Sequence, residues 1–398
     1  MLCKFRDSLG RYNSADSTAA LQCHGARAVF NRLSTHAHGP VTRPLVVRFG
    51  SMGDMVIALS LIHALHRRCG ELVDVVSSGS WTRPLLESQP GVGNLYLIRS
   101  RKTPYAVSPQ QQQLVRTLSA RGASPTWICD SDDKCRWLIA RAGIPESHIA
   151  DVRSLPEQPR EHAVDRWLRF AQASLASHDV SMRAIDARAL RVPPLRVAEQ
   201  WRRDLDAWLR AGNLVGRPLV LVQAGNRRTT KWWRPRQRPS NSKYWPEERW
   251  ARVIDRVAQS EPEAEILLMG VPSESRLNEA ILDLTTTRRV RNVARDLPLH
   301  RLLALQERAI GMISVDTGPA HSAGALGCPL VVLFGTADPD HYAPRSLSDA
   351  VVCLRGHDHH GASMLAICVD QVVDAWSTLR SAQRNGRHTS TMIRAAGR

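Results

Sequence analysis

The sequence predicts an α/β protein built from two doubly wound domains. Three observations lead to this prediction: short continuous apolar runs, segments of helical period between them, and small polar turns directly after several runs. A buried parallel strand is apolar throughout, because helices cover both faces of its sheet. Ligands of such sheets bind beyond the carboxyl ends of the strands, so these polar turns are where a functional site is expected.

The first domain is expected over residues 43–195. Residues 1–42 are polar and weakly periodic, and are predicted to be a disordered extension. Apolar runs predict strands at 44–49, 72–76, 94–98 and 126–129. Helical spacing predicts helices at 55–68, 111–120 and 134–142.

The second domain is expected over residues 196–383, after a linker at 181–194 that ends in two prolines. Its predicted strands are 219–222, 265–270, 313–315 and 330–334. Its predicted helices are 247–259, 274–284, 299–307 and 371–380, followed by a basic disordered tail at 384–398.

Composition sets the class of protein and of partner. The 398 residues suffice for two or three domains, and no apolar run approaches the roughly 20 residues that span a bilayer. The polar N-terminus predicts no secretory signal, and eight scattered cysteines without a Cys-x-x-Cys spacing suit a reducing cytosol. The net charge of +17 favours an anionic partner, which could be nucleic acid, acidic lipid or a phosphorylated glycolipid.

Two stretches carry charge of one sign. Residues 226–243 contain seven basic residues and no acid, and residues 384–398 contain four arginines and no acid. Such runs are often solvated surface, which is the alternative to a binding role.

The turn after the first predicted strand reads Gly50-Ser51-Met52-Gly53-Asp54. It lacks the Gly-x-Gly-x-x-Gly spacing of nicotinamide dinucleotide sites and the Gly-Lys-Ser/Thr of a P-loop. Asp54 either caps the helix that follows or carries chemistry.

The most specific motif is the turn at 316–321, Asp-Thr-Gly-Pro-Ala-His, which follows a predicted strand. Gly318 permits close backbone approach, and Pro319 suits the first position of a helix. Free N–H groups and the helix dipole would then favour an anion such as phosphate. The alternative is an ordinary strand-to-helix connection in which Asp316 caps the helix.

Three further segments supply polar groups near the ends of predicted strands. Asn226 follows Gln223-Ala224-Gly225, and Lys243 opens the block Lys243-Tyr244-Trp245-Pro246-Glu247. A lysine provides a point charge suited to a diphosphate. Glu274 either accepts hydrogen bonds from ribose hydroxyls or supplies a negative charge at a helix start.

These motifs, in this order, resemble glycosyltransferase family 9, the ADP-heptose:lipopolysaccharide heptosyltransferases, over roughly residues 44–380. The resemblance implies a GT-B type fold, in which two Rossmann-like domains face a central cleft. It implies an inverting glycosyltransferase that moves a heptose from ADP-heptose to a lipopolysaccharide inner-core acceptor.

The resemblance also assigns residues. Asp54 would be the catalytic base, beside an acceptor-side loop of Ser51, Met52 and Gly53. The donor would be bound by Asn226, Lys243, Glu274, Asp316, Thr317, Gly318 and His321. Gln223 departs from the histidine that the family often has there, and the basic insert at 227–238 exceeds the family's usual loop. Details of the phosphate site therefore stay open.

The resemblance implies no cofactor and no metal. The stretch His357-Asp358-His359-His360 is a compositional metal pattern, for which a surface loop is the favoured interpretation. The expected partners are a nucleotide sugar, a lipopolysaccharide core precursor and the anionic inner leaflet, and the expected location is cytoplasmic, peripheral at the inner membrane.

Three alternatives remain. One is a family member that uses another nucleotide sugar, and another is a non-catalytic relative that binds a sugar nucleotide. The third, a basic nucleic-acid-binding protein, is suggested by the charge and by Trp232-Trp233 within the insert, but no nucleic acid is expected because no recognised binding module is present.

Overall fold

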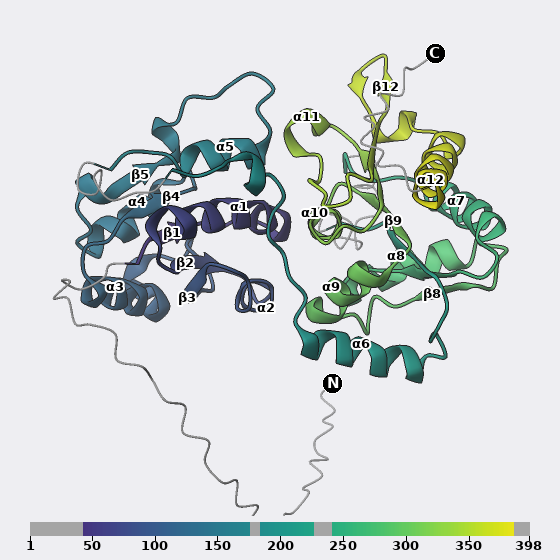
Figure 1. Cartoon of the computed structure of the whole chain (residues 1–398), viewed down its shortest axis with the longest axis horizontal. Helices are drawn as coiled ribbons and strands as arrows, with labels where there is room; N and C mark the ends of the chain where they lie inside the picture. The colour runs from purple at the N-terminus through teal and green to yellow at the C-terminus, as the bar shows by residue number, and fades with distance from the viewer. Residues whose placement is uncertain (1–42, 176–183, 227–240, 386–398) are drawn as a thin grey trace, which may run out of the picture. The chain divides into compact units, whose positions relative to one another are not determined.

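Two parallel β-sheets, each with helices on its faces, organise the computed structural model of the chain (Figure 1). The structure describes residues 43–175, 184–226 and 241–385. The predictions for residues 1–42, for the insert at 227–238 and for the tail beyond residue 385 lie outside the described residues.

The first sheet has five parallel strands in the order β3-β2-β1-β4-β5. They are β1 (Leu45–Val47), β2 (Val73–Ser78), β3 (Val92–Ile98), β4 (Thr126–Ile128) and β5 (Ile149–Asp151). Buried side chains alternate between the faces. Val46 packs with α1 and α5, whereas Leu45 and Val47 pack with α3 and α4. The helices are α1 (Met52–Cys69), α2 (Thr82–Leu86), α3 (Pro109–Arg121), α4 (Asp133–Arg141) and α5 (Ala163–Phe170).

The second sheet has six parallel strands in the order β11-β10-β9-β6-β7-β8. They are β6 (Leu219–Gln223), β7 (Glu265–Leu268), β8 (Val290–Asn292), β9 (Gly311–Val315), β10 (Leu330–Phe334) and β11 (Val351–Arg355).

Helices α7 (Glu247–Ser260), α8 (Ser275–Leu282) and α12 (Val369–Arg384) pack on one face of this sheet. Helices α9 (Leu299–Arg308) and α10 (Gly318–Ala325) pack on the other face, and α6 (Glu199–Ala211) packs against α9. A short helix α11 (Pro339–Tyr342) and a hairpin of β12 (His357–Asp358) and β13 (Gly361–Ala362) complete the fold. The prediction of two doubly wound α/β domains is confirmed.

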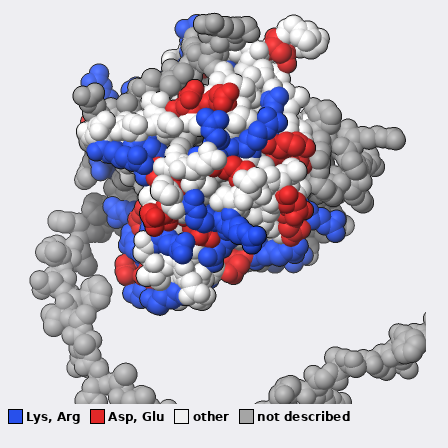
Figure 2. All heavy atoms as spheres, turned by 90° about the vertical axis from the view of Figure 1, so that its right-hand side faces the viewer, with Lys and Arg blue, Asp and Glu red and all other residues white. Residues whose placement is uncertain are grey.

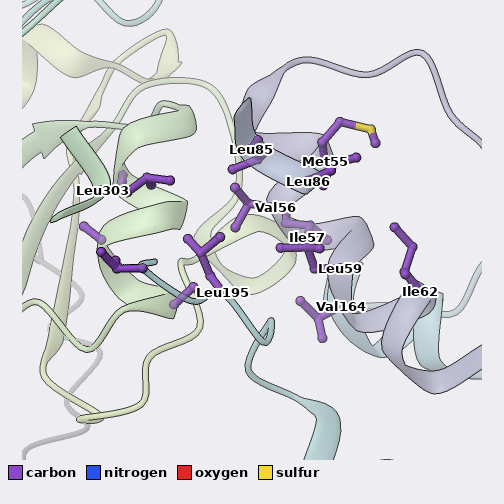
Figure 3. Packing of buried hydrophobic residues seen from close by; sticks show 14 of the residues in the cluster. Met55, Val56, Ile57, Leu59, Ile62, Leu85, Leu86, Val164, Leu195 and Leu303 are labelled. Carbon is purple, nitrogen blue, oxygen red and sulfur yellow. The ribbon is translucent and has the colours of Figure 1, made fainter. Parts of the chain in front are cut away.

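One apolar cluster takes side chains from helices of both sheets. Figure 3 labels members from α1, α2 and α9, together with Leu195 of the segment between the domains. Val56 of α1 and Leu303 of α9 are both fully buried in this cluster. Residues of both sheets' helices therefore belong to one hydrophobic cluster.

Charged side chains of both signs intermingle on the face shown in Figure 2. Ion pairs are frequent in the described residues: Arg380 and Arg384 share Glu261, with contacts of 2.8 and 3.0 Å. None of the helices within the described ranges has the length and hydropathy that a bilayer span requires.

Candidate active site

Both sheets have a topological switch point, where the strand order reverses and a crevice forms beyond the carboxyl ends. In the first sheet it lies between β1 and β4, and in the second it lies between β6 and β9. The turn at 48–54 follows β1, and the turns at 224–226 and 316–318 follow β6 and β9. The predicted catalytic and acceptor-side residues, and most of the predicted donor-binding residues, therefore lie at switch points.

Asp54 stands at the start of α1, on the turn after β1. It is the third residue of the helix rather than its N-cap, which is Ser51. Its Oδ2 accepts hydrogen bonds from the backbone N–H of Ser51 at 2.7 Å and from Ser51 Oγ at 2.8 Å. Its Oδ1 lies 3.3 Å from Nη2 of Arg48, and the side chain is 40% exposed. Asp54 thus stabilises the helix start and is also accessible to a substrate.

Asp316 directly follows β9 and is paired with Lys243, which lies before α7. Lys243 Nζ donates to Asp316 Oδ2 at 2.6 Å and to the Asp316 carbonyl at 2.7 Å. Thr317 is the N-cap of α10, so Gly318 opens the helix and Pro319 is its second residue, one position later than predicted. A fixed cation therefore lies beside the N-terminus of α10, whose dipole also favours an anion.

His321 is buried in the first turns of α10, with Nε2 3.8 Å from Asp316 Oδ1. Burial lowers the pKa of His321, and Lys243 adds to this effect, while Asp316 and Asp54 oppose it. The imidazole is therefore neutral near pH 7 and offers a hydrogen bond rather than a fixed positive charge.

Two glycines bring α1 and α10 into direct contact. A Cβ atom added to Gly53 would lie 2.9 Å from Cδ2 of His321, and one added to Gly318 would lie 2.9 Å from Cβ of Met52. Neither position has room for a methyl group. This approach joins the turn after β1 of the first sheet to the turn after β9 of the second.

The segment that carries Lys243 is held against the end of β10. A Cβ atom on Gly335 would lie 1.7 Å from the carbonyl oxygen of Ser242, so the two backbones touch. The Lys243 N–H donates to Asn241 Oδ1 at 3.2 Å, and Asn226 Nδ2 donates to the Lys243 carbonyl at 3.4 Å. Asn226 therefore helps to position the lysine, a role that its place in the sequence did not indicate.

Glu274 is buried beside the ends of β6 and β7. Its Oε2 accepts from the Val271 N–H at 3.0 Å and from Gln223 Nε2 at 3.3 Å, and Gly225 packs against the carboxylate. Burial raises the pKa of Glu274, and the two hydrogen bonds partly offset this. The bond to Val271 caps a short helix, so the predicted structural role is present, and Gln223 is the side chain that supports the carboxylate.

Sequence reasoning missed Arg48 and Asp130, which meet at the switch point of the first sheet. Arg48 Nη1 donates to Asp130 Oδ1 and to the Cys129 carbonyl, each at 3.0 Å. A signal was present: Arg48 is the one charge in the apolar run before the turn, and Asp130 directly follows another apolar run.

The His357–His360 stretch forms the exposed hairpin of β12 and β13. Throughout the part of the chain that the structure describes, no group of three or more His, Cys, Asp or Glu side chains is arranged to hold a metal ion.

Comparison with known proteins finds one matching family model and several similar proteins. The family model described as glycosyltransferase family 9 (heptosyltransferase) matches residues 136–368. Lipopolysaccharide heptosyltransferase 2 of Escherichia coli (strain K12) is 22% identical over 324 residues, which cover 78% of this chain and 87% of that protein. The protein of the same name from Salmonella typhimurium is 23% identical over 325 residues, with the same coverage.

Solved structures show the same fold. The E. coli ADP-heptose lipopolysaccharide heptosyltransferase II has a TM-score of 0.65 at 22% identity, covering 86% of this chain and 99% of its own. A family 9 glycosyl transferase from Veillonella parvula has a TM-score of 0.68 at 17% identity, covering 87% and 99%. An E. coli heptosyltransferase solved with ADP has a TM-score of 0.60 at 18% identity, covering 85% and 99%.

Proposed function

The chain belongs to glycosyltransferase family 9, the heptosyltransferase family, and we propose that it transfers a heptose from ADP-heptose to a lipopolysaccharide inner-core acceptor. It is a glycosyltransferase of the GT-B fold. The observation that carries the proposal is the contact of α1 with α10, which sets Asp54 beside the turn that bears Asp316 and His321. We call the turn after β1 the acceptor half, and the turns after β6 and β9 with Lys243 and Glu274 the donor half.

In the acceptor half, Asp54 acts as the general base. It takes the proton of the acceptor hydroxyl while that oxygen attacks the anomeric carbon of the heptose. The bond from the anomeric carbon to the diphosphate oxygen breaks as the new glycosidic bond forms, so the anomeric configuration inverts. The exposure of Asp54 supports this role, since a base must reach a hydroxyl of a large acceptor. Ser51, Met52 and Gly53 form the loop against which the acceptor lies.

In the donor half, positive charge and N–H groups stabilise the departing ADP. Lys243 supplies the cation, the N-terminus of α10 at Thr317 and Gly318 supplies its dipole, and His321 donates a hydrogen bond. Asp316, whose Oδ2 is paired with Lys243, accepts from sugar hydroxyls through its other oxygen. Glu274 accepts from the ribose, and the transfer proceeds without a divalent metal or other cofactor.

The acceptor is an anionic, lipid-anchored core precursor at the inner leaflet, and the enzyme works as a cytoplasmic protein peripheral to that membrane. The net charge of +17 supports an anionic partner. The basic insert at 227–238 is proposed to meet acceptor phosphates or lipid headgroups at the site.

The test is a donor screen. Thermal shift compares ADP-heptose with UDP-, GDP- and dTDP-sugars, and turnover is then measured with a core acceptor in EDTA. ADP-heptose should give the largest shift and should be consumed. Selective binding of another sugar nucleotide would mean that this nucleotide, and not ADP-heptose, is the donor. Salt-sensitive RNA binding without any sugar-nucleotide binding would overturn the function, and a bound donor without turnover would indicate a non-catalytic relative.

A further inference from the structure

Arg48 is held rigidly at the end of β1. Its Nη1 donates to Asp130 Oδ1 and to the Cys129 carbonyl at 3.0 Å each, both from the end of the adjacent strand β4. The guanidinium lies 5.3 Å from the ring centroid of Trp167 on α5. Asp130 is itself fixed, because its Oδ2 accepts from the Phe49 N–H at 2.6 Å. The arginine therefore has its position set by three elements of the first domain.

The other end of this guanidinium reaches Asp54. The two oxygens of that carboxylate have different partners: Oδ2 accepts from Ser51 on the same turn, while Oδ1 faces Arg48 Nη2 at 3.3 Å. Ser51 moves with the turn that carries Asp54, whereas Arg48 is anchored to the sheet. Among the described residues, Arg48 is the side chain that ties Oδ1 of Asp54 to the sheet.

We propose that Arg48, anchored by Asp130, is a positioning residue that aims Asp54 at the acceptor hydroxyl. A guanidinium is planar with its N–H groups in a fixed fork, so holding Nη1 on the end of β4 also sets where Nη2 meets Asp54. The inference rests on the proposed role of Asp54 as general base.

Few other charges face Asp54. His321, on α10, is the titratable group opposite, and its imidazole is neutral near pH 7. Asp316 and Lys243 lie around His321 and pair with each other. Asp130 lies behind Arg48 and has both oxygens occupied. Among the described residues, Arg48 is therefore the cation that contacts the Asp54 carboxylate directly.

The experiment compares Arg48→Gln and Arg48→Lys with Arg136→Gln as a matched control. Arg136 also bridges two carboxylates of the first domain, those of Glu146 and Asp151, but does not contact Asp54. For each variant, kcat, acceptor KM and ADP affinity are measured across pH 5 to 9, after melting curves have shown folded protein.

Arg48→Gln should lower kcat by about 10- to 100-fold, the size of effect expected when a reacting group is misplaced by an ångström. Acceptor KM and ADP affinity should not change. Arg48→Lys should restore only part of kcat, and Arg136→Gln should leave kcat as it is.

Wild-type kcat in folded Arg48→Gln would overturn the inference. A raised acceptor KM at unchanged kcat would also overturn it, since Arg48 would then bind the acceptor. If Arg48→Gln does not fold, Asp130→Asn tests the anchor: kcat should fall, and an unchanged kcat would refute the role. Full turnover by Asp54→Asn would instead remove the proposed base, so the two failures are distinguishable.

Discussion

The donor half and the acceptor half differ in how far solvent reaches their functional groups. In the donor half Asp316, His321 and Glu274 are all nearly buried, with exposed fractions of 6, 8 and 5%. In the acceptor half the Asp54 side chain is 40% exposed. A buried charge needs an oppositely charged partner, and Lys243 is that partner for Asp316. The donor half is thus built for one compact ligand, whereas the acceptor half stays open to a large one.

Asp54→Asn is the test of this contrast with the largest expected effect. The amide keeps an oxygen for the cap at Ser51 but cannot take the acceptor proton, so kcat should fall by about 10²–10⁴-fold. ADP affinity, measured by calorimetry, should not change because the donor half is intact. A folded variant with near-normal kcat would remove Asp54 from the mechanism. Weaker ADP binding in this variant would show that the two halves are not separable.

The next test is Lys243→Ala, which acts on the donor half. Loss of a charge-assisted contact should weaken ADP binding by about 1.5–3 kcal/mol, as measured by calorimetry. The variant should also melt earlier, because Asp316 is left buried without its cation. The control is Lys134→Ala, which removes an exposed lysine of the first domain. Unchanged ADP affinity in Lys243→Ala would contradict a donor half built on this pair.

The test with the smallest expected effect concerns a contact between the start of α5 in the first domain and the end of α11 in the second. His162 Nε2 lies 2.8 Å from the Ala343 carbonyl, and Nδ1 accepts from the Val164 N–H at 3.1 Å and from Arg345 Nε at 3.2 Å. Burial lowers the pKa of His162 to about 4, with Arg345 and His321 adding to the effect and Asp165 opposing it.

The direction in which stability changes with pH follows from proton binding by His162. Unfolded His162 takes up its proton near its usual value of 6.5, and the folded residue does so only near 4. Between these values the unfolded state binds more protons, so stability falls as pH drops from 6.5 towards 4. From pH 7 to pH 5 the loss should be about 2 kcal/mol, and His162→Gln should abolish that part in urea melts. An equal loss in both proteins would refute the role of His162.

The sequence predicted the strands that carry the site and missed several others. β1, β6 and β9 are continuous buried runs that end in small polar turns, so their pattern is unambiguous. β8 lies at a sheet edge with all three residues half-buried, and no apolar run marks it. β5, also three residues long, was missed as well. A short strand is most easily predicted where burial makes it apolar throughout and a turn motif follows it.

The candidate residues were found one by one, but not their partners. Arg48 and Asp130 are 82 positions apart, and Lys243 and Asp316 are 73 apart. Such pairs exist because adjacent parallel strands bring distant turns to one edge of the sheet. Local periodicity does not specify the order of the strands, so it cannot predict these pairs. The neutral state of His321 was likewise hidden, since it depends on burial in the folded protein.

The contact between Gly335 and Ser242 has a consequence for how this chain can vary. The Ser242 carbonyl rests directly on the end of β10, so the sheet, together with Asn226 and Asn241, sets the place of Lys243. Any side chain at position 335 would displace the lysine from Asp316. The position of this cation therefore depends on a single residue without a side chain.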